Sequence, residues 1–101
     1  MKSIWKYPLE TWTSTIKMPI GAKILACQLQ GEHPTLWALV DIEAPKHRRM
    51  FIRIVGTGHN LAGSFIDRAS YIATVQQHSL VWHIFEVPMQ ERPDSQEGEE
   101  K

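Results

Sequence analysis

The strongest pattern along the chain is a pair of apolar runs within residues 22–42, which predicts a β-hairpin. The first run alternates and places Leu25, Cys27 and Leu29 on one face, as in a strand with one buried side. The second run, residues 36–40, is continuously apolar, which is typical of a strand covered on both faces. We therefore expect the remaining strands to be added around this pair.

The rest of the chain divides into shorter strand-like segments separated by glycine and proline, which predict turns. A turn at residues 31–34 separates the two runs of the hairpin, and residues 60–69 fit either a loop or one short helical turn at 64–68. Turns at intervals of roughly 8–12 residues indicate an all-β domain of about seven short, mainly antiparallel strands, arranged as a small sandwich or a barrel. Besides the hairpin, the predicted strands are residues 3–9, 11–18, 48–55, 70–76 and 79–87.

The carboxyl-terminal residues have a different composition from the rest of the chain. They are rich in Glu, Gln, Ser, Pro and Gly, so they cannot bury enough apolar surface to fold. We expect a single β-rich domain at residues 1–88 and a disordered acidic tail at 89–101. Residues 88–101 hold five acids and two bases, which leaves the body mildly basic in a chain of zero net charge.

Composition also limits the compartment and the class of protein. The single cysteine, Cys27, excludes a disulfide within the chain and a cysteine-based zinc site, and its apolar strand predicts a core position. Met1-Lys2 is not followed by an apolar leader, and no run approaches the roughly 18 residues of a membrane span. These features predict a cytoplasmic protein without membrane contact. The basic residues 46–49 fit a solvated loop better than a nucleic-acid site, because the body carries little net charge.

One glycine-rich turn is a candidate for ligand chemistry. Gly56, Thr57, Gly58 and His59 follow a predicted strand, and glycines there let backbone amides approach an oxyanion closely. Together with Arg53, they form a candidate phosphate or nucleotide site. The alternative is an ordinary turn or bulge at the end of a strand.

Catalytic and metal chemistry have little support in the sequence. The five histidines lack the spacing of metal ligands, and no serine has the surroundings of a hydrolase nucleophile. We expect no catalytic residues, no metal site, no cofactor and no enzyme activity. His83 shares a strand face with Val81 and Phe85, which predicts a hydrogen-bonded core or boundary residue. Asp41 is a candidate partner for Arg53 across a sheet.

Aromatic residues divide into predicted core and predicted surface. Trp37 and Trp82 lie in strongly apolar strands and are expected inside. An amino-terminal edge strand limited by Pro8 would leave a surface for a protein partner or for homodimerisation by strand pairing. The residues predicted for this partner surface are Trp5, Tyr7, Trp12, Arg48 and Arg49.

Several motifs in a fixed order resemble a family of short uncharacterised proteins encoded by bacteriophages and prophages, carried as a domain of unknown function. The motifs are IWKYPLE (4–10), GAKIL…Q (21–28), LWALVD (36–41), GTGH (56–59), YIATVQ (71–76) and VWHIFE (81–86). The resemblance implies a phage-encoded, non-enzymatic accessory protein in the cytoplasm of the bacterial host. Such a protein would bind and modulate a host protein, in host takeover or counter-defence; the alternative is sequestration of a phosphorylated ligand at the GTGH turn.

Overall fold

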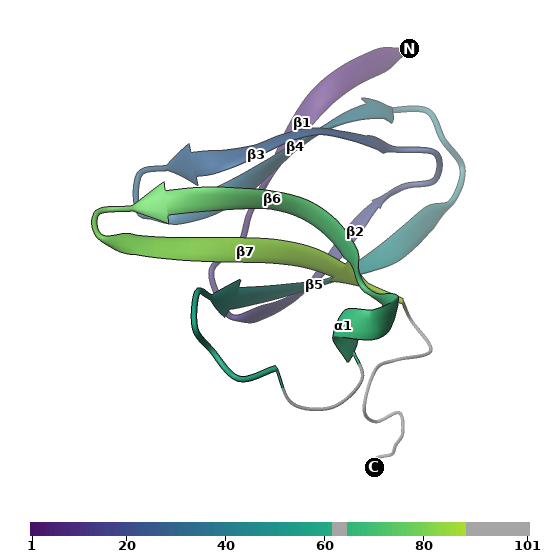
Figure 1. Ribbon diagram of the computed structural model, residues 1–101. Helices are drawn as coiled ribbons and strands as arrows, with labels where there is room; N and C mark the ends of the chain where they lie inside the picture. The colour runs from purple at the N-terminus through teal and green to yellow at the C-terminus, as the bar shows by residue number, and fades with distance from the viewer. Residues whose placement is uncertain (62–64, 89–101) are drawn as a thin grey trace.

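The protein is a sandwich of two antiparallel β-sheets, seen in a computed structural model that describes residues 1–61 and 65–88. The first sheet has the strand order β1-β4-β3 and the second β2-β5-β7-β6; the edge strands β3 and β6 lie side by side (Figure 1). The elements are β1 (Lys2–Pro8), β2 (Thr13–Pro19), β3 (Lys23–Gln30), β4 (His33–Asp41), β5 (His47–Gly56), α1 (Phe65–Arg68), β6 (Ser70–Gln77) and β7 (Leu80–Val87).

This architecture confirms the predicted all-β class, with seven antiparallel strands in the described residues, and of the two predicted arrangements it is the sandwich. α1 confirms a helical turn at the predicted place. Residues 89–101, predicted to be a disordered acidic tail, lie outside the described residues. No helix in the described part of the chain is long and apolar enough to span a membrane.

The predicted hairpin is β3 and β4, which pair antiparallel across a turn at Gly31 and Glu32. Gly31 has a φ of 62°, a conformation that glycine adopts without steric cost. The turn is shorter than predicted, because His33 and Pro34 belong to β4. Pro34 is tolerated near the beginning of the strand, where little of the hydrogen-bonded ladder is lost, and its carbonyl accepts a bond from the Leu9 amide at 2.8 Å.

A bulge in β3 changes which side chains face the core. The pairing passes from Ile24 with Ala38 to Ala26 with Trp37, so Leu25 is an extra residue. Leu25 is 47% exposed, whereas Ile24 packs against the core. The prediction that Leu25 shares a buried face with Cys27 is therefore wrong, because one extra residue inverts the alternation. Cys27 itself is buried, as predicted.

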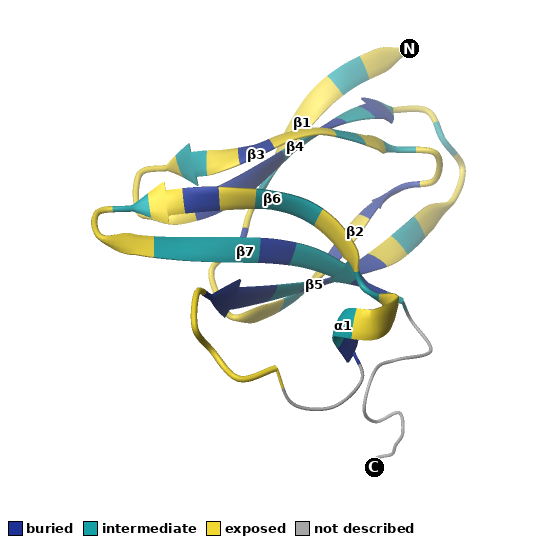
Figure 2. Cartoon of the chain, in the orientation of Figure 1, coloured by how far each residue is buried: buried dark blue, intermediate teal, exposed yellow. Residues whose placement is uncertain are grey.

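The two sheets enclose the main core, and β5 also contacts a second apolar cluster on its other face. Figure 2 shows buried residues along much of β4 and β5. The second cluster joins Phe51 and Val55 of β5 to Val87 of β7 and Phe65 of α1. The buried residues of the main core are Leu9, Ile16, Met18, Cys27, Leu36, Met50, Ile52, Ile54, Val75 and Ile84.

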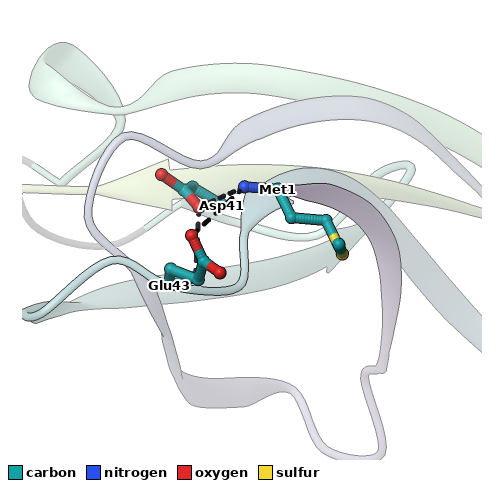
Figure 3. A network of polar contacts seen from close by, with 3 residues as sticks. All are labelled: Met1, Asp41 and Glu43. Carbon is teal, nitrogen blue, oxygen red and sulfur yellow. Dashed lines mark hydrogen bonds and ion pairs between the residues drawn. The ribbon is translucent and has the colours of Figure 1, made fainter.

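The predicted pair between Asp41 and Arg53 does not form, because their strands belong to different sheets. The Arg53 guanidinium lies 4.4 Å from the centre of the Phe65 ring, a cation–π contact. The Asp41 carboxylate accepts a bond from the Glu43 amide at 3.1 Å and lies 3.5 Å from the Met1 amino group (Figure 3). These contacts, the amide bond first, lower the pKa of Asp41.

Trp37 lies on the outer face of the first sheet, which corrects its predicted place in the core. Leu36 and Ala38 point from β4 into the core, so the intervening Trp37 faces outward, where it is partly covered. Lys6 pairs with Trp37 in the register, and the Lys6 Nζ donates to Gln30 Oε1 at 3.0 Å. β4 is therefore fully buried on one face only.

Candidate functional site

Several connections meet at one end of the sandwich, on the left in Figure 1, and an open cleft of about 420 Å³ lies among them. The volume falls within the range of about 300–1,000 Å³ that is usual for ligand sites. We call it the tryptophan cleft. It is lined by Leu9, Glu10, Thr11, Trp12, Glu32, His33, Pro34, Ile54, Gln77 and Trp82.

Two tryptophans from distant parts of the chain form an aromatic wall of the tryptophan cleft. Trp12 precedes β2, and its carbonyl accepts a bond from the Ile54 amide at 2.8 Å, which holds this loop against β5. The rings of Trp12 and Trp82 meet edge to face, with 4.9 Å between centroids and 76° between planes. The His59 ring lies beside this wall, outside the cleft lining, with its centroid 6.0 Å from that of Trp12. Trp12 is 55% exposed, so the wall is accessible.

Gln77 ties the aromatic wall to the other sheet. Its Oε1 accepts the indole N–H of Trp82 at 2.9 Å, while its Nε2 donates to the carbonyl and to Oε1 of Glu32, at 3.1 and 2.6 Å. Glu32 belongs to the β3–β4 turn, so these bonds connect the two sheets across the cleft. One amide side chain thereby fixes an indole and a carboxylate in relation to each other.

The lining of the tryptophan cleft carries negative charge. It contains the carboxylates of Glu10 and Glu32 and, among the residues that the structure describes, no lysine or arginine. His78 lies near Glu32, with 3.9 Å between His78 Nε2 and Glu32 Oε1. The Glu10 carboxylate makes no hydrogen bond or ion pair with another described residue. Acidic groups in a cleft favour the approach of cations.

The predicted anion-binding turn lies beside this aromatic wall, and most of its amides are already used. The Gly56 amide donates to His59 Nδ1 at 3.1 Å, the Thr57 amide to the Val81 carbonyl at 3.2 Å, and the His59 amide to the Gly56 carbonyl at 3.1 Å. A Cβ on Gly56 would lie 3.0 Å from the His59 ring and 3.1 Å from Trp82, so a larger residue there requires these side chains to shift by a few tenths of an ångström. Gly58 has a φ of 88°. The hydrogen bonds of this turn therefore hold His59 close to the two tryptophans. Arg53 does not belong to this group, because its guanidinium contacts the Phe65 ring.

A chain of hydroxyl groups surrounds His83 on the outer face of the second sheet. Thr57 Oγ1 lies 2.7 Å from His83 Nε2, and Thr74 Oγ1 lies 3.0 Å from His83 Nδ1. Tyr71 extends the chain through a 2.7 Å contact with Thr74. His83 is thus a hydrogen-bonded boundary residue, as predicted. The described residues contain no group of three His, Cys, Asp or Glu that could hold a metal ion.

The predicted partner-surface residues are dispersed over the molecule. Trp5 is 40% exposed on the edge strand β1, but the neighbouring Tyr7 packs against the core with a buried hydroxyl that has no partner within the described residues. Arg48 pairs with Glu86 at 3.2 Å, and Arg49 is exposed. Of these residues, only Trp12 lines the tryptophan cleft.

Comparison with protein families places the chain in a known group of sequences. Residues 1–95 match the family described as Domain of unknown function (DUF7352). The chain belongs to the DUF7352 family. No curated protein and no solved structure matches the chain. Family membership therefore agrees with the resemblance to a domain of unknown function and brings no activity with it.

Most of the cleft of this DUF7352 chain was not predicted from sequence. The sequence predicts Trp82 in the core, and Trp82 does pack against the main core while it also lines the cleft. Glu10, Glu32 and Gln77 carry no signal, because nothing in their local pattern shows that three separate connections meet. A weak signal existed: these side chains lie at or beside the ends of predicted strands, and ends of strands converge in a sandwich. Strand order is needed to know which ends converge.

Proposed function

We propose that this protein is a phage-encoded, non-enzymatic accessory protein that binds and modulates a protein of the bacterial host, with the tryptophan cleft as its recognition site. The observation that carries the proposal is an accessible wall formed by Trp12 and Trp82 at the end of a rigid sandwich. Tryptophan is enriched among the residues that dominate binding energy at protein interfaces. The resemblance of the motif order to that of phage and prophage proteins supports the phage origin.

The open form of the cleft favours a protein partner over a small molecule. Sites for small molecules usually enclose most of the ligand surface, whereas this cleft is largely open to solvent. A side chain or loop from a larger protein can enter such a cleft while its own body covers the opening. The surrounding turns would then contribute the rim of the interface.

The alternative, a phosphorylated ligand at the GTGH turn, has less geometric support. An anion cradle needs several outward-pointing amides, and three of the four in this turn donate within the protein. Arg53, the predicted cationic partner of the phosphate, instead stacks on Phe65.

The test is capture of partners from a bacterial lysate by three immobilised forms of the protein: wild type, Trp12→Ala and Trp5→Ala. Both substitutions remove a partly exposed indole, one in the cleft and one on β1. We expect Trp12→Ala to lose the captured host protein at least about tenfold, because truncation of a central interface residue costs ~2 kcal/mol or more. Trp5→Ala should retain it.

Circular dichroism and thermal melting would verify that both variants fold like the wild type. Equal capture by all three folded forms would refute the tryptophan cleft as the recognition site. Loss of capture with Trp5→Ala alone would move the site to the β1 edge.

A further inference from the structure

We propose that the tryptophan cleft binds the guanidinium group of an arginine side chain in a protein partner. This inference rests on the proposed function, because it names the chemistry of the partner at the same site. It is carried by the combination of aromatic rings and carboxylates that line one cleft.

The electrostatics of the lining select a cation. Glu10 and Glu32 supply two carboxylates, and no lysine or arginine among the described residues neutralises them within the lining. Glu10 is the more available of the two carboxylates for a ligand, since it has no hydrogen bond or ion pair to another described residue. These carboxylates would repel an anionic ligand, whereas a cationic ligand would form ion pairs with them.

The aromatic wall selects the kind of cation. A cation gains most from contact with the face of an indole, and arginine forms such contacts more often than lysine. Because guanidinium is planar, it can stack on a ring and at the same time donate two parallel bonds to a carboxylate. Trp12, Trp82 and Glu10 line the same cleft, so a guanidinium bound there has both indole rings and a carboxylate beside it.

Hydrogen bonds with one side chain also fix the orientation of two groups in the tryptophan cleft. Gln77 holds the Trp82 indole at 2.9 Å and the Glu32 carboxylate at 2.6 Å. These groups are therefore oriented before the partner arrives, which lowers the entropy cost of binding. The volume of about 420 Å³ exceeds that of one side chain, so backbone atoms beside the arginine also fit.

The experiment uses the full chain labelled with ¹⁵N and two peptides, acetyl-Gly-Gly-Arg-Gly-Gly-amide and the same peptide with citrulline in place of arginine. Citrulline keeps the shape of arginine and removes its charge. The protein has four tryptophans, two in the cleft and two outside it, so the NMR signals of the indole N–H groups show whether a peptide binds at the cleft. We expect the signals of Trp12 and Trp82 to shift with the arginine peptide and those of Trp5 and Trp37 to stay.

A single side chain should bind weakly, with a Kd of about 1 mM. We expect citrulline to weaken binding about fivefold or more, and Glu10→Gln to weaken binding of the arginine peptide about threefold or more. Glu43→Gln is the matched control, since it removes an exposed carboxylate at the opposite end of β4 and should leave the Kd unchanged.

Equal shifts with the two peptides, or none at about ten times the expected Kd, would overturn the arginine assignment. The two proposals fail differently. A cleft that recognises apolar groups would still show capture that depends on Trp12, but without a preference for arginine over citrulline.

Discussion

Folding changes the acidity of the Cys27 thiol, which lies in the core. Burial raises the pKa of its thiol to about 11, against a smaller opposing effect of a backbone hydrogen bond with Thr35. Burial also raises the pKa of Tyr7. Both groups are neutral when protonated, so the folded state holds these protons more tightly than the unfolded state does. The contribution of Cys27 to stability is therefore fully present below the pKa of the unfolded thiol, near 9, and is lost as the pH rises towards 11.

We therefore predict that Cys27 resists labelling by a thiol reagent in the native protein at about pH 8, where the thiolate fraction is on the order of one in a thousand. The melting temperature should fall between about pH 8.5 and 10.5, and less steeply in Cys27→Ala. Labelling rates with and without urea, together with melting curves at the two pH values, measure both effects. Rapid labelling of the folded protein would contradict the burial of Cys27.

Among the elements, β3 is the strand whose buried face was predicted wrongly from the sequence, because it contains a bulge. Alternation of apolar and polar residues predicts which side chains share a face of the sheet only where each residue pairs with one residue of the neighbouring strand. Leu25 is an extra residue without such a partner, so the alternation is inverted on either side of it. In β5, apolar side chains occupy both faces, because the main core covers one face and Phe65 of α1 packs with Phe51 and Val55 on the other. The strands themselves were predictable, whereas the bulge and the outward-facing Trp37 depended on pairing between strands.

Two adjacent substitutions distinguish the observed register from the one that the sequence suggested. Leu25→Lys should change the free energy of unfolding by less than about 0.5 kcal/mol, as is usual for exposed sites. Ile24→Lys should destabilise the protein by ~3 kcal/mol or more, because Ile24 packs against the main core and a charge would be buried there. Urea unfolding of both variants gives the comparison. The opposite order would mean that β3 has no bulge at this position.

At the scale of the whole molecule, the sandwich places different surfaces at its two ends. The tryptophan cleft, the GTGH turn and the β6–β7 turn lie at one end, while α1, the Met1 network and the basic residues after β4 lie at the other (Figure 1). The sequence indicated Trp12 and the GTGH turn separately. It could not place them together, because their meeting depends on β2 and β7 both pairing with β5. The free edge of β1 remains a proposed site for homodimerisation.

We propose that this protein binds its partner at the end of the sandwich that carries the tryptophan cleft. The most direct measurement is the spectrum of the four indole N–H groups of ¹⁵N-labelled protein, recorded in buffer and in a concentrated bacterial lysate. We predict that the signals of Trp12 and Trp82 shift or broaden in the lysate while those of Trp5 and Trp37 do not. Unchanged cleft signals beside a broadened Trp5 would contradict the claim and place the partner on the β1 edge.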